Sequence, residues 1–364
     1  MRWLIALALL PGCKSLLGFD ELAPAADGPG EIDGPLTDGP RDATDPVCFG
    51  STEMICLAGT PIDDVDIALG QVMSINTTRG CVEPTSTTVP EACVIALRSF
   101  TTAGTFRVTG SKPLVLIVSG IFEVQSSGRI DAGSRAGELG PGGRDCAPAT
   151  APSGGGGGAG GSLVARGGNG GQGNAGTGGV SASVMTTDSL VGGCSGSAGA
   201  GALPGAAGAG GGGLLIIAGS MFVDGRIDAS GQGGGGGVGS SSGGGGGGSG
   251  GVIMLDAPTI SLTATTGVIT AKGGGGGGGA GIPATADGQV GTDGATPPAT
   301  SSAPGGQGGE NGAGQGGAGG TSSTGSTGGS SGGRGGGGGG GATGVIRLIT
   351  PALLGGGTVV PMPQ

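Results

Sequence analysis

The chain has no histidine and no tyrosine, and it has only one tryptophan and six phenylalanines among its 364 residues. Without histidine it can form neither a Ser-His-Asp nor a Cys-His catalytic triad, nor the histidine-ligated zinc site of the usual zinc hydrolases. With so few aromatic side chains, the core must be aliphatic and narrow. No segment after the first 13 residues reaches the ~20 apolar residues that a membrane-spanning helix requires.

Glycine dominates what is present, with 100 residues. Three of its longest runs lead directly into an aliphatic segment: AGGGGLLII at 209–217, GGGGGGSGGVIML at 243–255 and GGGGGGGATGVIRL at 335–348. A flexible linker has no reason to repeat this junction. The pattern predicts a framework of strands with glycine-rich excursions at about 132–213, 230–251 and 272–344.

The excursions have two interpretations. Gly and Ser tracts are flexible by default. Glycine chains can also lie side by side as extended left-handed helices with three residues per turn and a rise of ~3.1 Å per residue. The runs adjoin strands and carry almost no charge, which favours some order, and the sequence leaves both interpretations open.

Beyond residue 48 the chain contains an irregular repeat. Its first half is aliphatic, at Leu114–Val118, Leu214–Ile217, Val252–Leu255 and Val345–Ile349. Its second half is GRIDAG from Gly128, GRIDAS from Gly225, a diverged GVITAK from Gly267 and a shorter GTVV from Gly357. Cys93–Leu97 and Thr105–Thr109 form an earlier copy. The alternation of Ile and Ala with polar residues is typical of a strand with one buried face.

These patterns predict an all-β fold. Strand pairs that recur without helices are typical of an irregular parallel β-helix or β-solenoid, in which each coil buries its inner face against its neighbours and long glycine-rich insertions are tolerated. A β-sandwich with glycine-rich loops is the alternative.

The first 13 residues have the form of a bacterial lipoprotein signal. Arg2 supplies a positive charge, Leu4–Leu10 is a short apolar stretch, and LLPG leads into Cys13. The pattern resembles a lipobox, which implies that residues 1–12 are removed and Cys13 is acylated. An ordinary signal peptide is the alternative. We expect an exported protein that is lipid-anchored at the outer membrane or cell surface of a Gram-negative bacterium.

Residues 13–47 are acidic, rich in Pro and Gly, and contain three DGP triplets. Such a segment buries too little apolar surface to offset its ordering entropy. It is predicted to be a disordered tether, which leaves residues 48–364 as the folded domain.

Six cysteines follow Cys13, an even number that suggests disulfides in an exported chain. Six cysteines allow 15 pairings. Local spacing favours Cys48 with Cys56, Cys81 with Cys93, and Cys146 with Cys194. A zinc site is disfavoured because the chain has no CxxC pair and no histidine, and we expect no metal and no cofactor.

The two GRIDA copies are the strongest candidates for catalysis in the sequence. Stacked coils would place Arg129 beside Arg226 and Asp131 beside Asp228, at about 4.8 Å between neighbouring strands. Two such carboxylates could bind calcium or perform acid-base chemistry on a polysaccharide. A solvent-facing ladder of charge rows is the simpler interpretation, and Val268 and Thr270 of the third copy weigh against a site.

The LLPGC signal, the DGP tether, the segments CVIA at 93–96 and GSKPLVLI at 110–117, the GRIDA copies, GGVIMLDAPTI at 250–260 and GVIRL resemble a family of glycine-rich predicted lipoproteins from myxobacteria. The resemblance covers most of the chain and implies a surface location and no particular activity. In composition the chain is also similar to the PGRS glycine-rich surface domains of mycobacteria.

We therefore expect a non-enzymatic structural or adhesive protein that binds envelope or matrix polymer, or other cells, through glycine-rich faces. The net charge of −10 disfavours nucleic acid as a partner. A β-helical polysaccharide lyase or glycosidase is the second hypothesis, and binding to ice is a third.

Overall fold

The computed structural model describes residues 46–364, except 185–188, 264, 284, 297 and 322–325. The described residues form 18 strands and no helix, so the all-β prediction is confirmed. The expected signal peptide, the lipidation site at Cys13 and the tether up to residue 45 lie outside the described residues. The folded region begins slightly earlier than predicted, because the first strand starts at Val47.

A small antiparallel sheet forms the beginning of the described chain. It contains β1 (Val47–Phe49), β2 (Ile55–Leu57) and β5 (Ser86–Thr87), in the order β1-β2-β5. The remaining strands belong to two larger sheets in which every strand pair is parallel.

The nine-stranded sheet consists of two rows that share the long strands β9 (Leu114–Val124) and β11 (Leu214–Val223). The first row adds β6 (Cys93–Leu97), β13 (Val252–Asp256) and β16 (Val345–Ile349). The second row adds β3 (Asp64–Ile67), β7 (Ser99–Thr102), β14 (Thr259–Leu262) and β17 (Ala352–Gly355). The register shifts between Ala218 and Ser220, where the first row gives way to the second.

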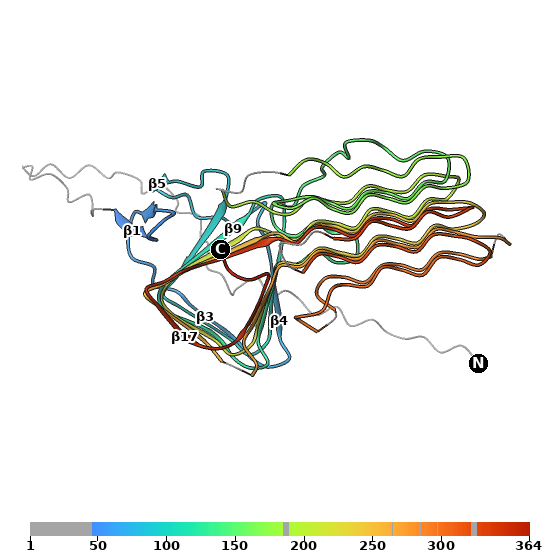
Figure 1. Cartoon of the computed structure of the whole chain (residues 1–364). Coiled ribbons are helices and arrows are strands. Elements are labelled where there is room, and N and C mark those ends of the chain that lie inside the picture. Colours follow the sequence, from blue (N-terminus) through green and yellow to red (C-terminus); the bar gives the residue numbers. More distant parts are fainter. Residues whose placement is uncertain (1–45, 185–188, 264, 284, 297, 322–325) are drawn as a thin grey trace, which may run out of the picture. The chain divides into compact units, whose positions relative to one another are not determined.

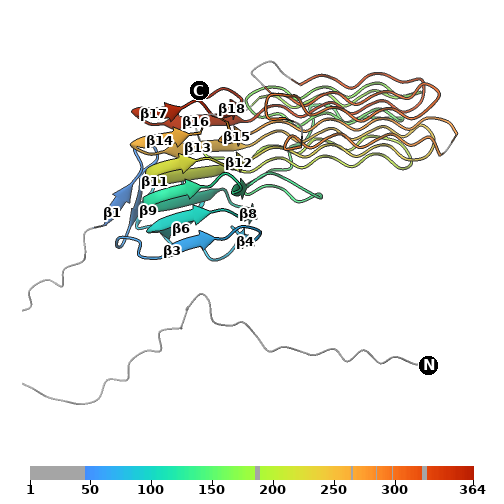
Figure 2. The ribbon, with the colours of Figure 1, turned by 90° about the horizontal axis from the view of Figure 1, so that it is seen from below.

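The six-stranded sheet is the third row. It contains β4 (Val72–Asn76), β8 (Thr105–Thr109), β10 (Arg129–Asp131), β12 (Arg226–Asp228), β15 (Val268–Thr270) and β18 (Thr358–Val360). In all three rows, neighbouring strands follow chain order, as Figure 2 shows. All segments that the repeat predicts to be strands are strands, whereas β1 to β5, β7, β14, β17 and the second halves of β9 and β11 were not predicted.

Side chains from the three rows meet in one aliphatic core. Leu116 comes from the first row, Phe122 from the second and Ile130 from the third, and all three are fully buried. Three phenylalanine rings gather in this core, where Phe100 stacks on Phe122 and meets the edge of Phe106, with 5.2 Å between ring centroids in both pairs. The core is therefore as aliphatic as the composition predicts.

The first row is buried on both faces. Val115, Ile117 and Leu215 point away from the main core and pack against a second cluster that includes Ile55 of β2 and Leu163. Double burial explains why these strands read as continuous apolar runs such as LVLIV, without polar alternation.

The excursions form a bundle of extended segments that projects from the strands (Figure 1). We call the described parts of 145–183, 189–213, 229–251 and 271–344 the glycine bundle. Its segments run outward, turn and return, and the last returns lead into β11, β13 and β16. The turns far from the strands, such as 173–176, 239–242 and 310–312, are its distal turns.

Hydrogen bonds between backbones hold the bundle together. In segment 243–251, successive N–H groups donate in rotation to three different neighbouring segments, with N···O distances of 2.8–2.9 Å. The acceptors are Ala200, Ser197 and Cys194 on one neighbour, Gly336, Gly339 and Ala342 on the second, and Gly235, Gln232 and Ala229 on the third. Its carbonyls accept from three more neighbours, through residues that include Gly205, Gly158 and Gly277.

This threefold rotation is the pattern of packed glycine helices with three residues per turn. Glycine is required for space and not for φ at these positions. A Cβ atom at Gly245 would overlap the carbonyl oxygen of Ala206, and one at Gly277 would overlap that of Gly235. The structure therefore selects the packed interpretation of the excursions over the flexible one.

Candidate functional site

The two GRIDA copies stack in register in the third row. Arg129 lies opposite Arg226 and Asp131 opposite Asp228, as the sequence predicts. The same row continues to Arg107 on one side of Asp131 and to Thr270 on the other side of Asp228. Two carboxylates and several cations are thus brought together by strands far apart in sequence.

Asp228 is fully buried and has several polar partners. Its carboxylate accepts from Arg129 at 2.8 Å, from the hydroxyl of Ser230 at 2.7 Å and from the hydroxyl of Thr270 at 2.9 Å. The third copy is therefore part of the cluster, because Thr270 supplies a donor where the first two copies have Asp.

Asp131 is only 5% exposed and is surrounded by guanidinium groups. Arg107 and Arg135 each lie 3.0 Å from its carboxylate, and Arg129 lies at 3.5 Å. Arg107 also donates to the carbonyl of Gly133 at 2.9 Å. We call Asp131, Asp228 and the arginines at 107, 129, 135 and 226 the charge cluster.

The charge cluster is covered, contrary to the expectation of a solvent-facing ladder. Arg226 donates to the carbonyl of Ala295 at 2.9 Å, and the ammonium of Lys272 donates to those of Pro298 at 3.1 Å and Ser301 at 3.0 Å. These carbonyls belong to a stretch where the bundle returns to the strands. Lys272 is 0% exposed, although its type is almost always at the surface.

The two carboxyl groups are shifted in opposite directions. Burial raises the pKa of Asp131, with the charge of Asp228 adding to it and Arg129 and Arg107 opposing it. Burial also acts on Asp228, but Arg226 and Arg129 outweigh it and hold its pKa below the ordinary value. Burial and the charge of Arg226 lower the pKa of Lys272 to about 8.

Opposed pKa shifts in neighbouring carboxyls are a feature of acid-base sites. Here, however, the carboxylate oxygens are occupied by arginine, serine and threonine donors, which leaves little access for a polymer. In the part of the chain that the structure describes, no group of three or more Cys, Asp or Glu side chains is arranged to hold a metal ion. The arrangement is suited to fastening the bundle to the strands.

Sequence reasoning missed three members of the site. Arg107 lies in TFRVT, which aligns with the RID triplets once β8 is placed beside β10. Lys272 follows Thr270 by two residues in GVITAK, the spacing that puts both on one face of a strand. Arg135 had no local signal, because its position depends on the start of the first excursion.

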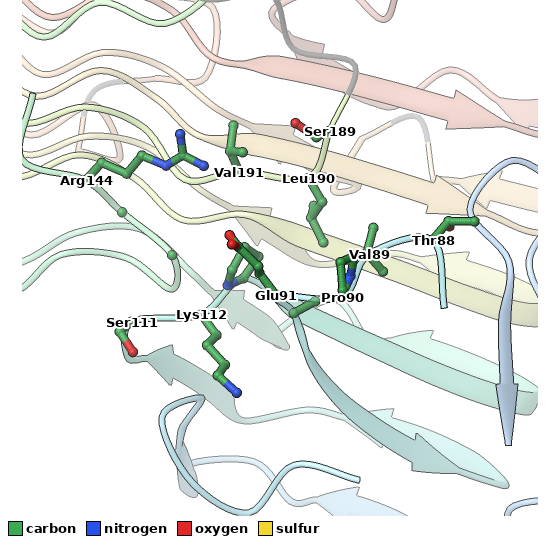
Figure 3. Close-up of a pocket in the computed structure, with 14 residues that line it drawn as sticks. Thr88, Val89, Pro90, Glu91, Ser111, Lys112, Arg144, Ser189, Leu190 and Val191 are labelled. Atoms are coloured by element: carbon green, nitrogen blue, oxygen red, sulfur yellow. The ribbon is translucent and has the colours of Figure 1, made fainter. Parts of the chain in front are cut away.

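A cavity of about 630 Å³ lies on another part of the surface (Figure 3). Glu91, Lys112 and Arg144 bring charges of both signs to its wall, beside the apolar Val89 and Leu190. A second cavity, of about 670 Å³, has Asp256 in its wall. Ser51 donates to that carboxylate through its backbone N–H at 2.6 Å and its hydroxyl at 2.9 Å, which ties the start of the described chain to β13.

The structure contains three disulfides, between the cysteines that local spacing favours. They join Cys48 to Cys56, Cys81 to Cys93, and Cys146 to Cys194. The third closes the base of the first long excursion, across 48 residues.

Comparisons with models of protein families, with curated proteins and with solved structures found no match for this chain. Among the residues placed by the structure, no helix has the length and apolar character needed to cross a membrane.

Proposed function

We propose that this chain is a surface-anchored lipoprotein of the myxobacterial glycine-rich type, with a structural or adhesive role. The observation that carries the proposal is the hydrogen-bonded glycine bundle. A bundle in which each inner segment bonds to its neighbours along its length is stiff, and its faces carry few charges. Such a body is suited to holding an extended binding surface away from a membrane.

We interpret the three rows of strands as the faces of an irregular parallel β-solenoid. Neighbouring strands in each row follow chain order, and side chains from all rows enter one core. A β-sandwich would instead pack antiparallel strands in two sheets. The solenoid provides a base of regular pitch from which the glycine segments leave and to which they return.

The proposed location is the outer membrane or cell surface, with a lipid on Cys13 as the anchor and the acidic tether as a spacer. The three disulfides support an extracytoplasmic location, because such bonds persist in oxidising compartments. Replacing Cys13 with Ser should abolish incorporation of labelled fatty acid and release the protein from the membrane. Full incorporation into the variant would contradict the anchor.

The adhesive role is tested with cells that display the full chain. Gly245→Val should reduce attachment to isolated cell envelope and matrix, because a side chain at this inner position overlaps the carbonyl of Ala206. Gly333→Val is the matched control, since a Cβ there meets only one atom, at 4.0 Å. Equal attachment of both variants, at equal surface display, would contradict a role for the bundle.

A carbohydrate-active enzyme is the second candidate. The opposed pKa shifts of Asp131 and Asp228 favour it, and their burial under arginine side chains disfavours it. The full chain should be assayed on a panel of polysaccharides beside Asp131→Asn and Asp228→Asn. If the native protein cleaves a polysaccharide and both variants lose this activity, the enzyme proposal would replace the adhesive one.

A further inference from the structure

Several outer segments of the glycine bundle lie side by side on one part of its surface. Segment 303–309 bonds to 312–320 through the N–H of Gly316 and the carbonyl of Gly306. Segment 312–320 bonds in turn to 326–332, where Ser330 donates to Gln315 at 2.9 Å. Segment 326–332 then bonds to 167–173, where Gly332 donates to Gln172 at 2.9 Å.

These segments expose side chains at every third residue. In one segment Asn169 and Gln172 are exposed, and in another Thr327 and Ser330. Gln307 and Gln315 are exposed on the remaining two. Three residues of a glycine helix span about 9 Å, so the exposed groups of 167–173 and of 326–332 repeat at that spacing. We call these six residues the amide face.

The side chains of neighbouring segments are also aligned across the face. The amide of Gln315 donates to the side-chain oxygen of Gln307 at 2.9 Å. The backbone N–H of Gln315 donates to the hydroxyl of Ser330 at 2.7 Å. The hydroxyl of Thr327 accepts from the N–H of Ala318 at 2.6 Å. Thr327 and Ala318 are each three residues from Ser330 and Gln315, so the same contact recurs one helical repeat along the segments. The result is a grid of hydrogen-bonding groups that are aligned between neighbouring segments and repeat at about 9 Å along two of them.

The grid is uncharged. Its six residues are amides and hydroxyls, and charged residues lie just beyond the ends of these segments, as Arg166 does before Asn169 and Glu310 after Gln307. Elsewhere on the bundle the pattern is different, because segment 205–213 exposes Ala206, which has no hydrogen-bonding side chain. Amides and hydroxyls both donate and accept, as sugar hydroxyls do.

We propose that the amide face binds an uncharged polysaccharide. A polymer of regular repeat can meet several rows of the grid at once, so weak single contacts add along the chain. The absence of charge from the grid disfavours nucleic acid and anionic lipid surfaces, which are bound through basic residues. This inference rests on the proposed function and specifies the face and the class of polymer.

The test uses the full chain in detergent and the insoluble uncharged polymers cellulose, chitin and curdlan in sedimentation assays. The variant Gln307→Ala/Gln315→Ala/Ser330→Ala should bind at least about tenfold more weakly, because each lost hydrogen bond contributes modestly and several are lost together. The control is Gln71→Ala/Gln364→Ala/Ser126→Ala, which removes the same side chains from exposed positions among the strands. It should bind like the native protein.

Equal binding of the two triple variants, with native amide-exchange protection in both, would overturn the amide face as the binding surface. Failure of the native chain to bind any of the three polymers would overturn the inference even if displayed protein still promotes attachment, in which case the adhesive proposal stands. If the native chain binds none of the polymers and displayed protein does not promote attachment, both the inference and the adhesive proposal are overturned. Thermal hysteresis that depends on the same three residues, without polymer binding, would assign the face to ice.

Discussion

Arg129 of β10 donates to Asp228 of β12 across 2.8 Å, while also lying 3.5 Å from Asp131 of its own strand. One guanidinium therefore connects two neighbouring strands of the third row, which are separated in sequence by a long glycine-rich excursion. Arg107 and Thr270 extend the connection to the strands on either side. Together with Thr270, the charge cluster thus links four neighbouring strands at the place where the bundle joins them.

Replacing Asp228 with Asn should destabilise the fold by about 3 kcal/mol, because loss of one partner leaves buried guanidinium groups without a counter-charge. The free energy of unfolding from denaturant titration measures this effect. Asp64→Asn is the control, since Asp64 pairs with Arg98 at the exposed edge of the second row. Its effect should be much smaller, and comparable losses in the two variants would argue against the charge cluster as a fastening.

Lys272 should make stability depend on alkaline pH. Its pKa is lowered to about 8 in the fold, from an ordinary 10.5. Between these values the unfolded chain binds more protons than the folded one, so stability should rise as the pH increases from about 8 to 10.5. Lys272→Met should lack this rise. Parallel profiles of thermal unfolding for the native chain and the variant would show that Lys272 titrates normally.

Gly245→Ala should destabilise the bundle by about 1–3 kcal/mol, as is typical of an added methyl group in a filled space. Neither glycine in the comparison needs a positive φ, so the matched substitution Gly333→Ala changes only the available space. It should be nearly neutral. A neutral result at both positions in denaturant titration would mean that the inner segments are not closely packed.

Backbone amides of the bundle should exchange slowly with solvent. The N–H groups of Gly246 and Ser249 donate to the carbonyls of Ser197 and Cys194 on a neighbouring segment, so they open only when the bundle opens. Their protection should approach that of β11, while the exposed Gly59 should exchange fast. Exchange of the backbone amides of 243–251 within seconds would contradict the packed bundle and show that the excursions are flexible loops.

The strands were predictable where their chemistry is local. The aliphatic runs and the GRIDA copies carry burial patterns that stand out against glycine, and their similarity gave the register of Arg129 beside Arg226. The second-row strands were missed because segments such as β14 are short and carry only a brief alternation. Their identity as strands depends on pairing with β11 and β17, which lie far away in the chain.

The charge cluster shows the limit of the same reasoning. Alternation placed Asp131 and Asp228 on the outward face correctly, and outward positions of a strand are ordinarily solvated. Their burial depends on Arg135 and on carbonyls at 295–301, which return from an excursion and close over the row. The spacing of residues around the GRIDA copies therefore does not predict that Asp131 and Asp228 are buried.

The glycine content determined that the excursions could pack closely, because only residues without a Cβ permit such approach. Whether they do pack was decided by tertiary structure. A single glycine helix has no internal hydrogen bonds, so each N–H must find its partner on a remote segment, as Gly244 does on Gly336 and Gly245 on Gly235. The glycine-rich sequence permits close approach of the backbones, and the stacked strands hold the glycine-rich segments near enough to pack.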